Sequence, residues 1–467
     1  LNARCKHSYE VVVVDDNSPD RTGEYLAGCT GLTVVSNEEN LGYLLSTNKG
    51  VESSSGDYVI LLNNDTEVSD GWIDDLLSTF DEYPDTGLVG ACLIYPDGRL
   101  QEAGAIIFKD GSGWNYGRFQ DPGADLFASV REVDYCSAAC VAIQRNVWDE
   151  ARGFDERFAP AYYEDVDLAF TLRLLGWKVR YQPRVKIIHY EGISHGTDDS
   201  SGLKAHQKIN RSVFVEKWAT ELQSHYTNEP QNVWKASARS VLGKILVADY
   251  EVPHWDCHAG GQRMKRLLEL LIDLGWHVVF VPGNKSATEP YASFLRNRGI
   301  EIRCAYTTPE EFISECEGSF DVAILPRPDD GSRWLSPLRT AAPATKIIYD
   351  TVDLHSVRLL RAREIGAANI DVRQEKQISD LEQSLIAAAD GTFVVSAVEK
   401  SWISKRIKGA SVSVIPLIHD EPLSSAAFTD RSGILFIGSW NHPPNRDAID
   451  FLVDEIMPLV WSKEPGI

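Results

Sequence analysis

The sequence predicts an α/β fold, because strand-like and helix-like segments alternate along it in two successive regions. In the first half, the β-branched run "YEVVVVDDNS" is typical of a buried strand, and "LGYLLSTNKGVESSSG" is typical of a helix. The same alternation starts again at "KILVADY". A chain of 467 residues is longer than one ordinary core, so two or more domains are expected.

The composition argues against several classes of protein. Lys+Arg total 46 against 68 Asp+Glu, and the resulting net charge of −22 is unfavourable for a nucleic-acid partner. No apolar run approaches the roughly 20 residues that a membrane-spanning helix needs, so membrane contact is expected to be peripheral at most. The eight cysteines include no Cys-x-x-Cys pair, which favours reduced thiols in a cytoplasmic protein.

The first-half elements follow in order from these patterns. Strands are predicted at residues 9–18, 32–37 and 57–65, with a helix at 41–56 between the second and the third. Strands that alternate with helices form parallel sheets, whose ligands bind beyond the carboxyl ends of the strands. Further along, a loop with exposed aromatic rings is expected at 109–125, and an amphipathic helix begins near Asp165 and is followed by a strand.

The second half is predicted to hold another doubly wound α/β domain. Residues 229–243 resemble a linker in composition, and strands such as "HVVFVP", "FDVAILPRP" and "TKIIYDTVD" follow in residues 244–430. In residues 431–467, "GILFIGSWNHPPNRDAIDFLVDEIMPLV" predicts one strand and one helix. One such unit cannot bury its own apolar face, so we expect either a truncated domain there or docking of this unit on the preceding domain.

Polar residues at strand ends are the candidate site. Asp65 ends the strand "YVILLNND", and a carboxylate beside amide oxygens suits Mg²⁺ or Mn²⁺, although Asn-Asn-Asp-Thr also favours a simple turn. His189 ends a later apolar strand, where it serves either as a structural residue or as a metal ligand. Glu164, Asp165 and Asp167 open a helix, where acids cap the helix dipole or act as a general base.

These segments together resemble glycosyltransferase family 2, and more narrowly the bacterial rhamnosyltransferases of O-antigen and surface-polysaccharide assembly. The resemblance covers about residues 9–225 and rests on "VVVVDDNSPD", "NEENLGYLLSTNKGVESSSGDYVILLNNDTEV", "GFDERFAPAYYEDVDLAFTLRLLGWKVRYQP" and "HYEGISHGTD". It implies a GT-A nucleotide-diphospho-sugar transferase domain over residues 1–228. It also implies another strand and helix before Tyr9, which we expect this chain to lack.

The resemblance also implies the donor and the donor site. The donor would be dTDP-rhamnose or a UDP-sugar, and Asp16 would accept a hydrogen bond from its pyrimidine N–H. Asp65 matches the last acid of the family's Asp-x-Asp motif and His189 a further ligand, so both would bind Mg²⁺ or Mn²⁺. Asn64 stands where many members carry an acid. The whole predicted nucleotide-sugar site is Asp15, Asp16, Asn17, Ser18, Asn40, Gly42, Asn48, Asn64 and Asp65.

For the reaction, the resemblance implies one direct, inverting displacement. Asp165 matches the general base that deprotonates the acceptor hydroxyl, and Glu164 would orient the acceptor. The acceptor would be a glycan or a lipid-linked glycan, and Trp114, Tyr116 and Tyr162 are candidates for stacking on its sugars. The enzyme would then work in the cytoplasm or peripherally at the inner face of the plasma membrane.

Residues 244–467 resemble the family 4-like, GT-B glycosyltransferases that are fused behind such enzymes. The matching segments are "ILVADYEVPHWDCHAGGQRMKRLLELLIDLGWHVVFVP", "KIIYDTVDLH", "FVVSAVEK" and "GILFIGSWNHPPNRDAIDFLVDEIMPLV". The resemblance implies a Rossmann-like GT-B N-terminal domain at 244–430 and the start of a second Rossmann-like half at 431–467. Gly260 and Gly261 precede a helix and either approach an anion or form a plain helix-start loop.

The sequence also bears on three function classes other than glycosyltransferases. Nucleotidyl transfer also uses acids and a metal at strand ends, but no basic phosphate-binding loop lies near Asp65. A dehydrogenase is disfavoured because no Gly-x-Gly-x-x-Gly follows a strand. The alternative outside catalysis is a carbohydrate-binding or scaffold fragment of a larger bifunctional glycosyltransferase. Such a fragment would bind glycan without a nucleotide or a metal.

Overall fold

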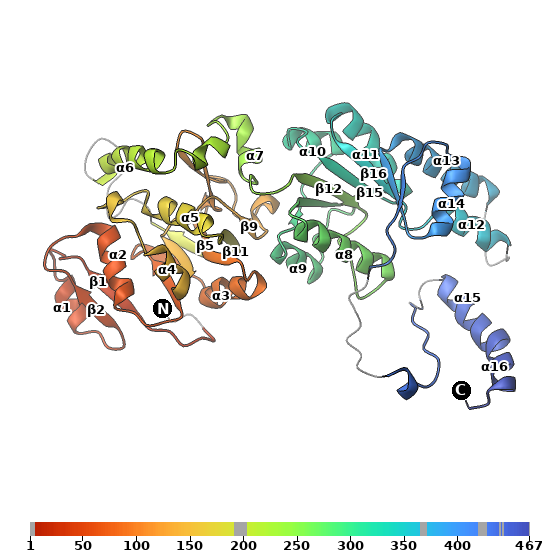
Figure 1. Cartoon of the computed structure of the whole chain (residues 1–467), viewed down its shortest axis with the longest axis horizontal. Helices are drawn as coiled ribbons and strands as arrows, with labels where there is room; N and C mark the ends of the chain where they lie inside the picture. Colours follow the sequence, from red (N-terminus) through yellow and green to blue (C-terminus); the bar gives the residue numbers. More distant parts are fainter. Residues whose placement is uncertain are drawn as a thin grey trace. The chain divides into compact units, whose positions relative to one another are not determined.

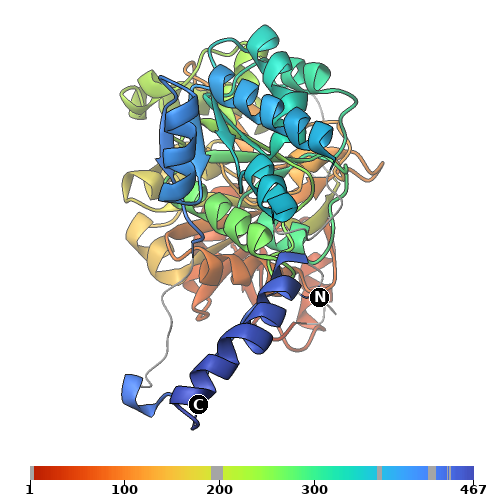
Figure 2. The ribbon, with the colours of Figure 1, turned by 90° about the vertical axis from the view of Figure 1, so that its right-hand side faces the viewer.

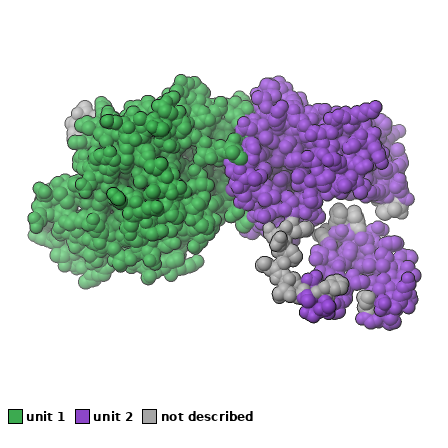
Figure 3. Space-filling model, viewed as in Figure 1, with its two compact units in different colours: residues 1–244, 293–319 green, residues 245–292, 320–467 purple. Residues whose placement is uncertain are grey.

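The computed structural model describes residues 5–190, 203–364, 371–418, 427–438, 440 and 443–466. The chain divides into two compact units, which Figure 3 colours separately. The first unit comprises residues 1–244 and 293–319, and the second comprises 245–292 and 320–467. The boundaries predicted for the individual domains stay predictions.

Short strands and helices alternate through the first unit (Figure 1). Its strands are β1 (Val12–Asp15), β2 (Thr33–Ser36), β3 (Tyr58–Leu62), β4 (Thr66–Val68), β5 (Thr86–Ile94), β6 (Leu100–Glu102), β7 (Ala105–Ile107), β8 (Gly113–Asn115), β9 (Arg131–Glu132), β10 (Cys140–Gln144), β11 (Lys178–His189) and β14 (Glu301–Ile302). Its helices are α1 (Thr22–Ala27), α2 (Gly42–Glu52), α3 (Trp72–Glu82), α4 (Arg145–Ala151), α5 (Glu164–Leu174), α6 (Leu203–Lys217), α7 (Val233–Ala236) and α10 (Pro309–Glu315). The 3-10 turns are η1 (Asp125–Phe127), η2 (Glu156–Phe158), η3 (Glu221–Ser224) and η4 (Pro230–Asn232).

The main sheet of the first unit is mixed, so the expected parallel sheet is wrong for most of its pairs. Its central order is β3-β10-β5-β11-β4. Among the described strands of this sheet, only β5 and β11 pair in parallel, whereas β10 runs antiparallel to β3 and β5, and β4 runs antiparallel to β11. Parallel pairing needs a crossover element, and the described chain between β5 and β10 has only the short turn η1 besides strands and loops. The parallel pair β1–β2 forms a separate sheet.

Both faces of the main sheet are covered, which explains its apolar strands. Along β5, Leu88 and Cys92 belong to one buried cluster, which also includes side chains of α2, α4 and α5. Val89 and Leu93 of the same strand belong to the other cluster, which packs against α3. A strand buried on both faces loses the alternation of polar and apolar residues.

A bulge interrupts the long strand β11. Gln182 pairs with Ala91 of β5 and Lys186 with Cys92, so three additional residues of β11 lie opposite a single step of β5. After the bulge, Ile187 and His189 pair in regular register with β4. The bulge therefore sets which side chains the end of β11 presents to each face.

The second unit contains the predicted parallel α/β arrangement. Its strands are β12 (Lys244–Asp249), β13 (His277–Pro282), β15 (Val322–Pro326), β16 (Lys346–Asp350), β17 (Gly391–Val394) and β18 (Val412–Val414). Its helices are α8 (Ala259–Asp273), α9 (Tyr291–Asn297, which ends beyond the unit boundary), α11 (Pro328–Ala341), α12 (His355–Glu364), α13 (Val372–Ala388) and α14 (Ala397–Arg406). The order runs from β13 through β12, β15, β16 and β17 to β18, and the neighbouring strands from β12 to β18 pair in parallel. The likeness of this unit to GT-B enzymes stays a prediction.

The predicted strand near residue 435 is wrong, whereas the helix after it is present. Residues 427–438 contain the 3-10 turn η5 (Phe428–Asp430) and no strand, and Leu435 and Ile437 are 82% and 84% exposed. No other described strand pairs with this segment, so its backbone has no sheet to join. Figure 2 shows α15 (Pro443–Phe451), the π-helical η6 (Leu452–Ile456) and α16 (Met457–Lys463) as one continuous helical segment. None of the helices in the described ranges is long and apolar enough to cross a membrane.

Candidate functional site

Strand pairing brings Asp65 and His189 together. Thr66 of β4 lies opposite His189 of β11, and Asp65 immediately precedes Thr66. The backbone carbonyl of Asp65 accepts a hydrogen bond from Tyr190 N–H at 2.9 Å, which closes the pair. His189 Nε2 lies 3.3 Å from Asp65 Oδ1, and both side chains are largely buried. The predicted juxtaposition of these two residues is therefore present in the structure.

A glutamine that the sequence reasoning missed orients His189. Gln101 Oε1 lies 3.1 Å from His189 Nδ1, and both residues are buried. An amide oxygen can only accept, so Nδ1 carries the proton and donates it to Gln101. Nε2 is then the ring nitrogen that faces Asp65. A metal-binding histidine is commonly held by such a second partner, but a single glutamine in a sequence carries no signal of it.

The pair fits a divalent cation that shares its coordination with a ligand. A carboxylate oxygen and an imidazole nitrogen facing each other are suitable donors for Mn²⁺. In the described ranges, no group of three or more His, Cys, Asp and Glu side chains is arranged as a metal site. Divalent cations bound with phosphates commonly use one or two protein ligands and complete their shell with phosphate oxygens and water. Asp65 and His189 fit that kind of site rather than an all-protein cage.

The candidate acids Glu164 and Asp165 lie in the first turn of α5, after two tyrosines with left-handed backbones. Tyr162 and Tyr163 both have φ of 73°, a conformation that non-glycine residues rarely adopt and that tertiary contacts must hold. Asn210 of α6 supplies such contacts, since its side-chain amide donates to the carbonyls of Phe158, Ala161 and Tyr162 at 2.7–2.9 Å. The turn that presents both acids is therefore fixed from outside α5.

The two acids differ in their electrostatic surroundings. Burial and the charge of Asp165 raise the pKa of Glu164 well above its ordinary value, and Glu164 Oε2 is buried without a hydrogen-bond partner. Burial also raises the pKa of Asp165, but hydrogen bonds from Val166 N–H at 2.8 Å and Ala138 N–H at 3.4 Å oppose that rise. Two acids whose pKa values are pushed apart can hold one proton between them. Asp165 is the better carboxylate, and Glu164 is the better proton donor.

Hydrogen bonds to Asp16 join the end of β1, where several predicted nucleotide residues lie, to the start of α2. The Asp16 carboxylate accepts hydrogen bonds of 2.8 Å from Leu41 N–H, Gly42 N–H and the Asn37 amide. Asn40 donates to the Asp16 carbonyl at 3.2 Å. Partial burial would raise the pKa of Asp16, but these hydrogen bonds lower it below its ordinary value. The structure thus brings Asp16, Asn40 and Gly42 together, while their contact with a nucleotide stays a prediction.

The other residues at the end of β1 and the start of α2 support this arrangement. Asp15 is buried, and its carboxylate accepts from Ser18 N–H at 3.1 Å across Asn17, whose φ is 57°. Gly42 has φ of 80°, and a Cβ atom there would lie 2.7 Å from the Pro160 Cβ, so only glycine fits. Asn64 lies exposed in the turn before Asp65, and its role in donor binding stays a prediction.

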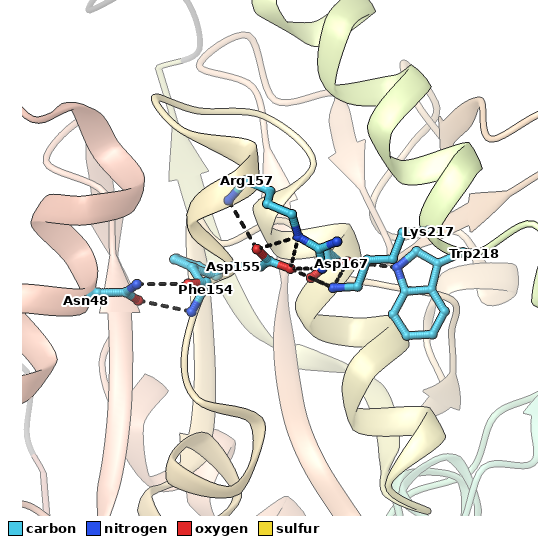
Figure 4. A network of polar contacts seen from close by, with 7 residues as sticks. All are labelled: Asn48, Phe154, Asp155, Arg157, Asp167, Lys217 and Trp218. Carbon is cyan, nitrogen blue, oxygen red and sulfur yellow. Dashed lines mark hydrogen bonds and ion pairs between the residues drawn. The ribbon is translucent and has the colours of Figure 1, made fainter.

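Asn48 is engaged by the protein itself. Its side-chain nitrogen donates to Phe154 O at 2.9 Å, and its side-chain oxygen accepts from Phe154 N–H at 3.0 Å (Figure 4). Both polar atoms of the amide therefore hold the loop before η2. The structure shows this clamp, and the predicted contact of Asn48 with a nucleotide stays untested.

Asp167 lies in the first turn of α5, and its side chain is the centre of a polar network. Lys217 Nζ lies within 2.8 Å of both Asp167 and Asp155, and Trp218 Nε1 donates to Asp167 at 2.7 Å (Figure 4). Arg157 binds Asp155 from the other side. Burial raises the pKa of Asp167, against the opposing effect of Lys217 and Trp218. This network joins the C-terminus of α6 to the first turn of α5.

The three aromatic acceptor candidates have different surroundings. Tyr116 is 7% exposed and packs edge-on against Phe127 at 5.5 Å, so its predicted stacking on a sugar is wrong. Its ring belongs to the buried apolar cluster that also contains Phe127. Trp114 is 40% exposed and stays a candidate. Tyr162 is half-buried beside the two acids and also stays a candidate.

In the second unit, Gly260 and Gly261 lie inside the first turn of α8. Gly261 N–H donates to His258 Nδ1 at 2.9 Å, so that donor is already used by the helix cap. A Cβ atom at position 261 would lie 2.5 Å from His254 O. Close approach of two backbone segments therefore accounts for Gly261 without an anion.

Comparison with known proteins gives one family match and several related sequences. Residues 1–148 match the family model "Glycosyl transferase family 2". "Uncharacterized protein y4gI" of Sinorhizobium fredii is 29% identical over 224 residues, which are 46% of this chain and 24% of that protein. "N-acetylglucosaminyl-diphospho-decaprenol L-rhamnosyltransferase" of Mycobacterium tuberculosis is 27% identical over 231 residues, 44% of this chain and 75% of the relative. "O-antigen biosynthesis protein RfbC" of Myxococcus xanthus is 33% identical over 162 residues, 33% of this chain and 12% of the relative.

These matches support a glycosyltransferase enzyme, although the chain spans only about a quarter of the first relative's length. Among solved structures, GalNAc-T7 with UDP, GalNAc and Mn²⁺ is 18% identical. The similarity covers 46% of this chain and 43% of that one with a TM-score of 0.37, and so low a score supports no further conclusion.

Proposed function

We propose that the chain is a metal-dependent, inverting glycosyltransferase, because residues 1–148 match the family model "Glycosyl transferase family 2". It would move rhamnose or a hexose from a nucleotide-sugar to a glycan acceptor in surface-polysaccharide or O-antigen biosynthesis. The observation that carries the proposal is the Asp65–His189 pair at 3.3 Å. The acid pair Glu164–Asp165 supports it, because residues 137–139 contact both this pair and the turn before Asp65. Ala138 N–H donates to Asp165, and Ala139 O accepts from Asn63 N–H.

The mechanism follows from the charges of these side chains. Asp65 and His189 would hold Mg²⁺ or Mn²⁺, which when bound neutralises the negative charge of the departing nucleotide diphosphate. Asp165, as the carboxylate of the acid pair, removes the proton of the acceptor hydroxyl. Glu164 keeps its proton and donates a hydrogen bond that orients the acceptor. The hydroxyl oxygen then attacks the anomeric carbon opposite the leaving group, which inverts that centre.

The donor is dTDP-rhamnose or a UDP-sugar, and the acceptor is a glycan or a lipid-linked glycan. A named rhamnosyltransferase among the relatives favours rhamnose and a diphospho-lipid acceptor. We place the enzyme in the bacterial cytoplasm, with peripheral contact to the inner face of the plasma membrane where the acceptor is lipid-linked.

Calorimetric titration with UDP and dTDP tests the donor site. In the presence of Mn²⁺ we expect one of the two nucleotides to bind, and we expect binding to be lost without Mn²⁺ and in Asp65→Ala. Asp81→Ala is the matched control, because Asp81 is an exposed carboxylate of α3. Nucleotide binding that survives in Asp65→Ala would contradict the proposed metal site.

A pocket in the second unit favours a second candidate function, carbohydrate binding. A pocket of about 210 Å³ lies at the carboxyl ends of β12 and β15. Its lining residues are Asp249, Tyr250, Glu251, Pro253, His258, Gly261, Arg327, Asp329 and Asp330. Because β12 is followed by β13 on one side and paired with β15 on the other, this is a switch point of the sheet, where ligands of α/β proteins bind.

Asp330 is the side chain of this pocket that is best suited to accept a hydrogen bond from a ligand. Asp330 is 7% exposed, and within the described residues its carboxylate makes no hydrogen bond or ion pair. Burial raises its pKa to about 6, against the opposing charge of Arg327. The acids of the pocket outnumber Arg327, which disfavours a phosphate and favours neutral hydroxyl groups as donors to Asp330.

Saturation-transfer NMR with rhamnose and glucose oligosaccharides tests this second candidate. Without nucleotide and with EDTA, we expect a signal that Asp330→Ala weakens about tenfold and that Asp65→Ala leaves unchanged. An equal signal in Asp330→Ala would remove the pocket as the binding site.

A further inference from the structure

Two neighbouring residues of the short strand β6 contact the two parts of the proposed site. The metal half is Asp65 with His189, and the acid half is Glu164 with Asp165. Gln101 is 4% exposed and Glu102 is 1% exposed, and neither was among the residues predicted from the sequence. Successive side chains of a strand point to opposite faces. Gln101 and Glu102 therefore have different surroundings although they are adjacent.

Gln101 belongs to the metal half. Its side-chain oxygen lies 3.1 Å from His189 Nδ1, while His189 Nε2 lies 3.3 Å from Asp65. With a carbonyl oxygen in place as an acceptor, the imidazole ring can neither flip nor move its proton without losing a buried hydrogen bond. Gln101 thus fixes both the tautomer and the direction of His189.

Glu102 belongs to the acid half, which it reaches through the backbone of residues 137–139. Glu102 Oε1 accepts a hydrogen bond from Ser137 N–H at 2.9 Å. The next N–H, that of Ala138, donates to Asp165 Oδ2 at 3.4 Å. The carboxylates of Glu102 and Asp165 are therefore held by consecutive peptide N–H groups.

The same three-residue segment also contacts the residues before Asp65. Ala139 O accepts from Asn63 N–H at 3.0 Å, and Ala138 O accepts from the Tyr43 hydroxyl at 3.3 Å. A displacement of this segment would move Asp165 relative to the turn that carries Asp65. Glu102 is the side chain that holds its first N–H.

We propose that β6 is the positioning strand of the transferase site, with Gln101 orienting His189 for the metal and Glu102 fixing the 137–139 backbone against Asp165. This inference rests on the proposed function, whose metal site it deepens. Neither residue touches the reacting atoms in this scheme. Each acts through the side chain or backbone that it holds.

Mn²⁺ titration followed by electron paramagnetic resonance of the free ion tests the first role. In the full chain with UDP or dTDP present, we expect Gln101→Leu to weaken Mn²⁺ binding roughly tenfold or more. Gln101→Glu keeps an acceptor for Nδ1–H and should retain binding. Gln144→Leu is the matched control, because Gln144 pairs with Tyr58 at the start of β3, away from the end that precedes Asp65, and donates to Thr86 O at 3.1 Å.

Hydrogen exchange measured by mass spectrometry tests the second role. We expect Glu102→Leu to speed exchange of the Ser137 and Ala138 amides and to leave Mn²⁺ affinity within about twofold of the unmodified chain, while Glu102→Gln, which keeps an acceptor oxygen, preserves the protection. Gln101→Leu should show the opposite combination, with weak Mn²⁺ binding and normal protection.

The outcomes separate the two proposals. If the unmodified chain binds no Mn²⁺ with either nucleotide, the proposed function fails. If it binds Mn²⁺ and Gln101→Leu binds equally well, or if each variant alters both readouts alike, the transferase site stands and the positioning roles are overturned.

Discussion

In the first turn of α5, Glu164 and Asp165 are close enough for the charge of Asp165 to raise the pKa of Glu164. We predict that Asp165→Asn lowers kcat about 10²- to 10⁴-fold, because the amide cannot accept the acceptor's proton. The KM for the donor should change little. Steady-state kinetics checks this, with Asp81→Asn on the exposed face of α3 as the control. A kcat within threefold of the unmodified enzyme would exclude Asp165 as the base.

The pH dependence of the same reaction follows from the direction of the Asp165 pKa. Burial raises that pKa above the ordinary value of 3.8. Only the carboxylate form accepts a proton, so we predict that kcat falls as the pH drops through this raised pKa. The acid limb should therefore lie at higher pH than an exposed aspartate would give. A pH–rate profile without an acid limb above the ordinary value would contradict this assignment.

Glu164 should make the stability of the chain depend on pH. Its folded-state pKa lies well above the ordinary value of 4.5, so the folded chain holds this proton more tightly than the unfolded chain. The resulting stabilisation is complete below that ordinary value and is lost as the pH rises toward the folded-state pKa. Glu164→Gln stays neutral at every pH.

We therefore predict that Glu164→Gln raises the free energy of unfolding relative to the unmodified chain at pH 8, by about 1 kcal/mol or more, and less at pH 5. Urea denaturation at the two pH values measures the difference. The amide N–H of the variant can still donate to the acceptor, so kcat should fall less than in Asp165→Asn. An equal effect at both pH values would show that the buried carboxyl is not the cause.

The helix α6 lies outside the candidate site and holds the start of α5, which carries the candidate acids, in place. Lys217 and Trp218 bind Asp167, and Asn210 binds the carbonyls before α5. We predict that Lys217→Met destabilises the first unit by about 1–3 kcal/mol, because Asp167 is 2% exposed and would lose its cationic partner. Thermal unfolding measures this loss. Lys208→Met, on the exposed face of α6, should stay within about 0.5 kcal/mol.

The elements also show what the sequence could and could not predict. The strand that precedes the Asp65 turn and the strand that ends at His189 were predicted, because apolar runs followed by polar residues are local signals. The antiparallel partners β4 and β10 were not, because pairing direction depends on contacts between distant segments. Gln101, Glu102 and Asn210 were not predicted for the same reason, since their hydrogen-bond partners lie 35 to 88 residues away in the sequence. Tyr116 was misassigned, because a loop-like composition does not reveal which ring turns into the core.

For the whole molecule, the division into two compact units predicts at least two thermal transitions. Mn²⁺ with the bound nucleotide should raise only the transition of the unit that carries Asp65 and His189. At a ligand concentration of about 100 Kd, the stabilisation is about 2.7 kcal/mol. Scanning calorimetry checks this, and Asp65→Ala should remove the shift. A ligand-dependent shift in both transitions would show that the units do not unfold independently.

The bulge in β11 limits how this chain can diverge. Three additional residues separate the pairing of Gln182 from that of Lys186, and His189 follows three residues later. Losing or gaining one residue between the bulge and the end of β11 would turn His189 to the opposite face of the sheet, away from Asp65. Two-residue changes would restore the face. Homologues that retain this histidine should therefore differ in length here by even numbers of residues, so that insertions and deletions in this stretch of a gene family follow a parity rule.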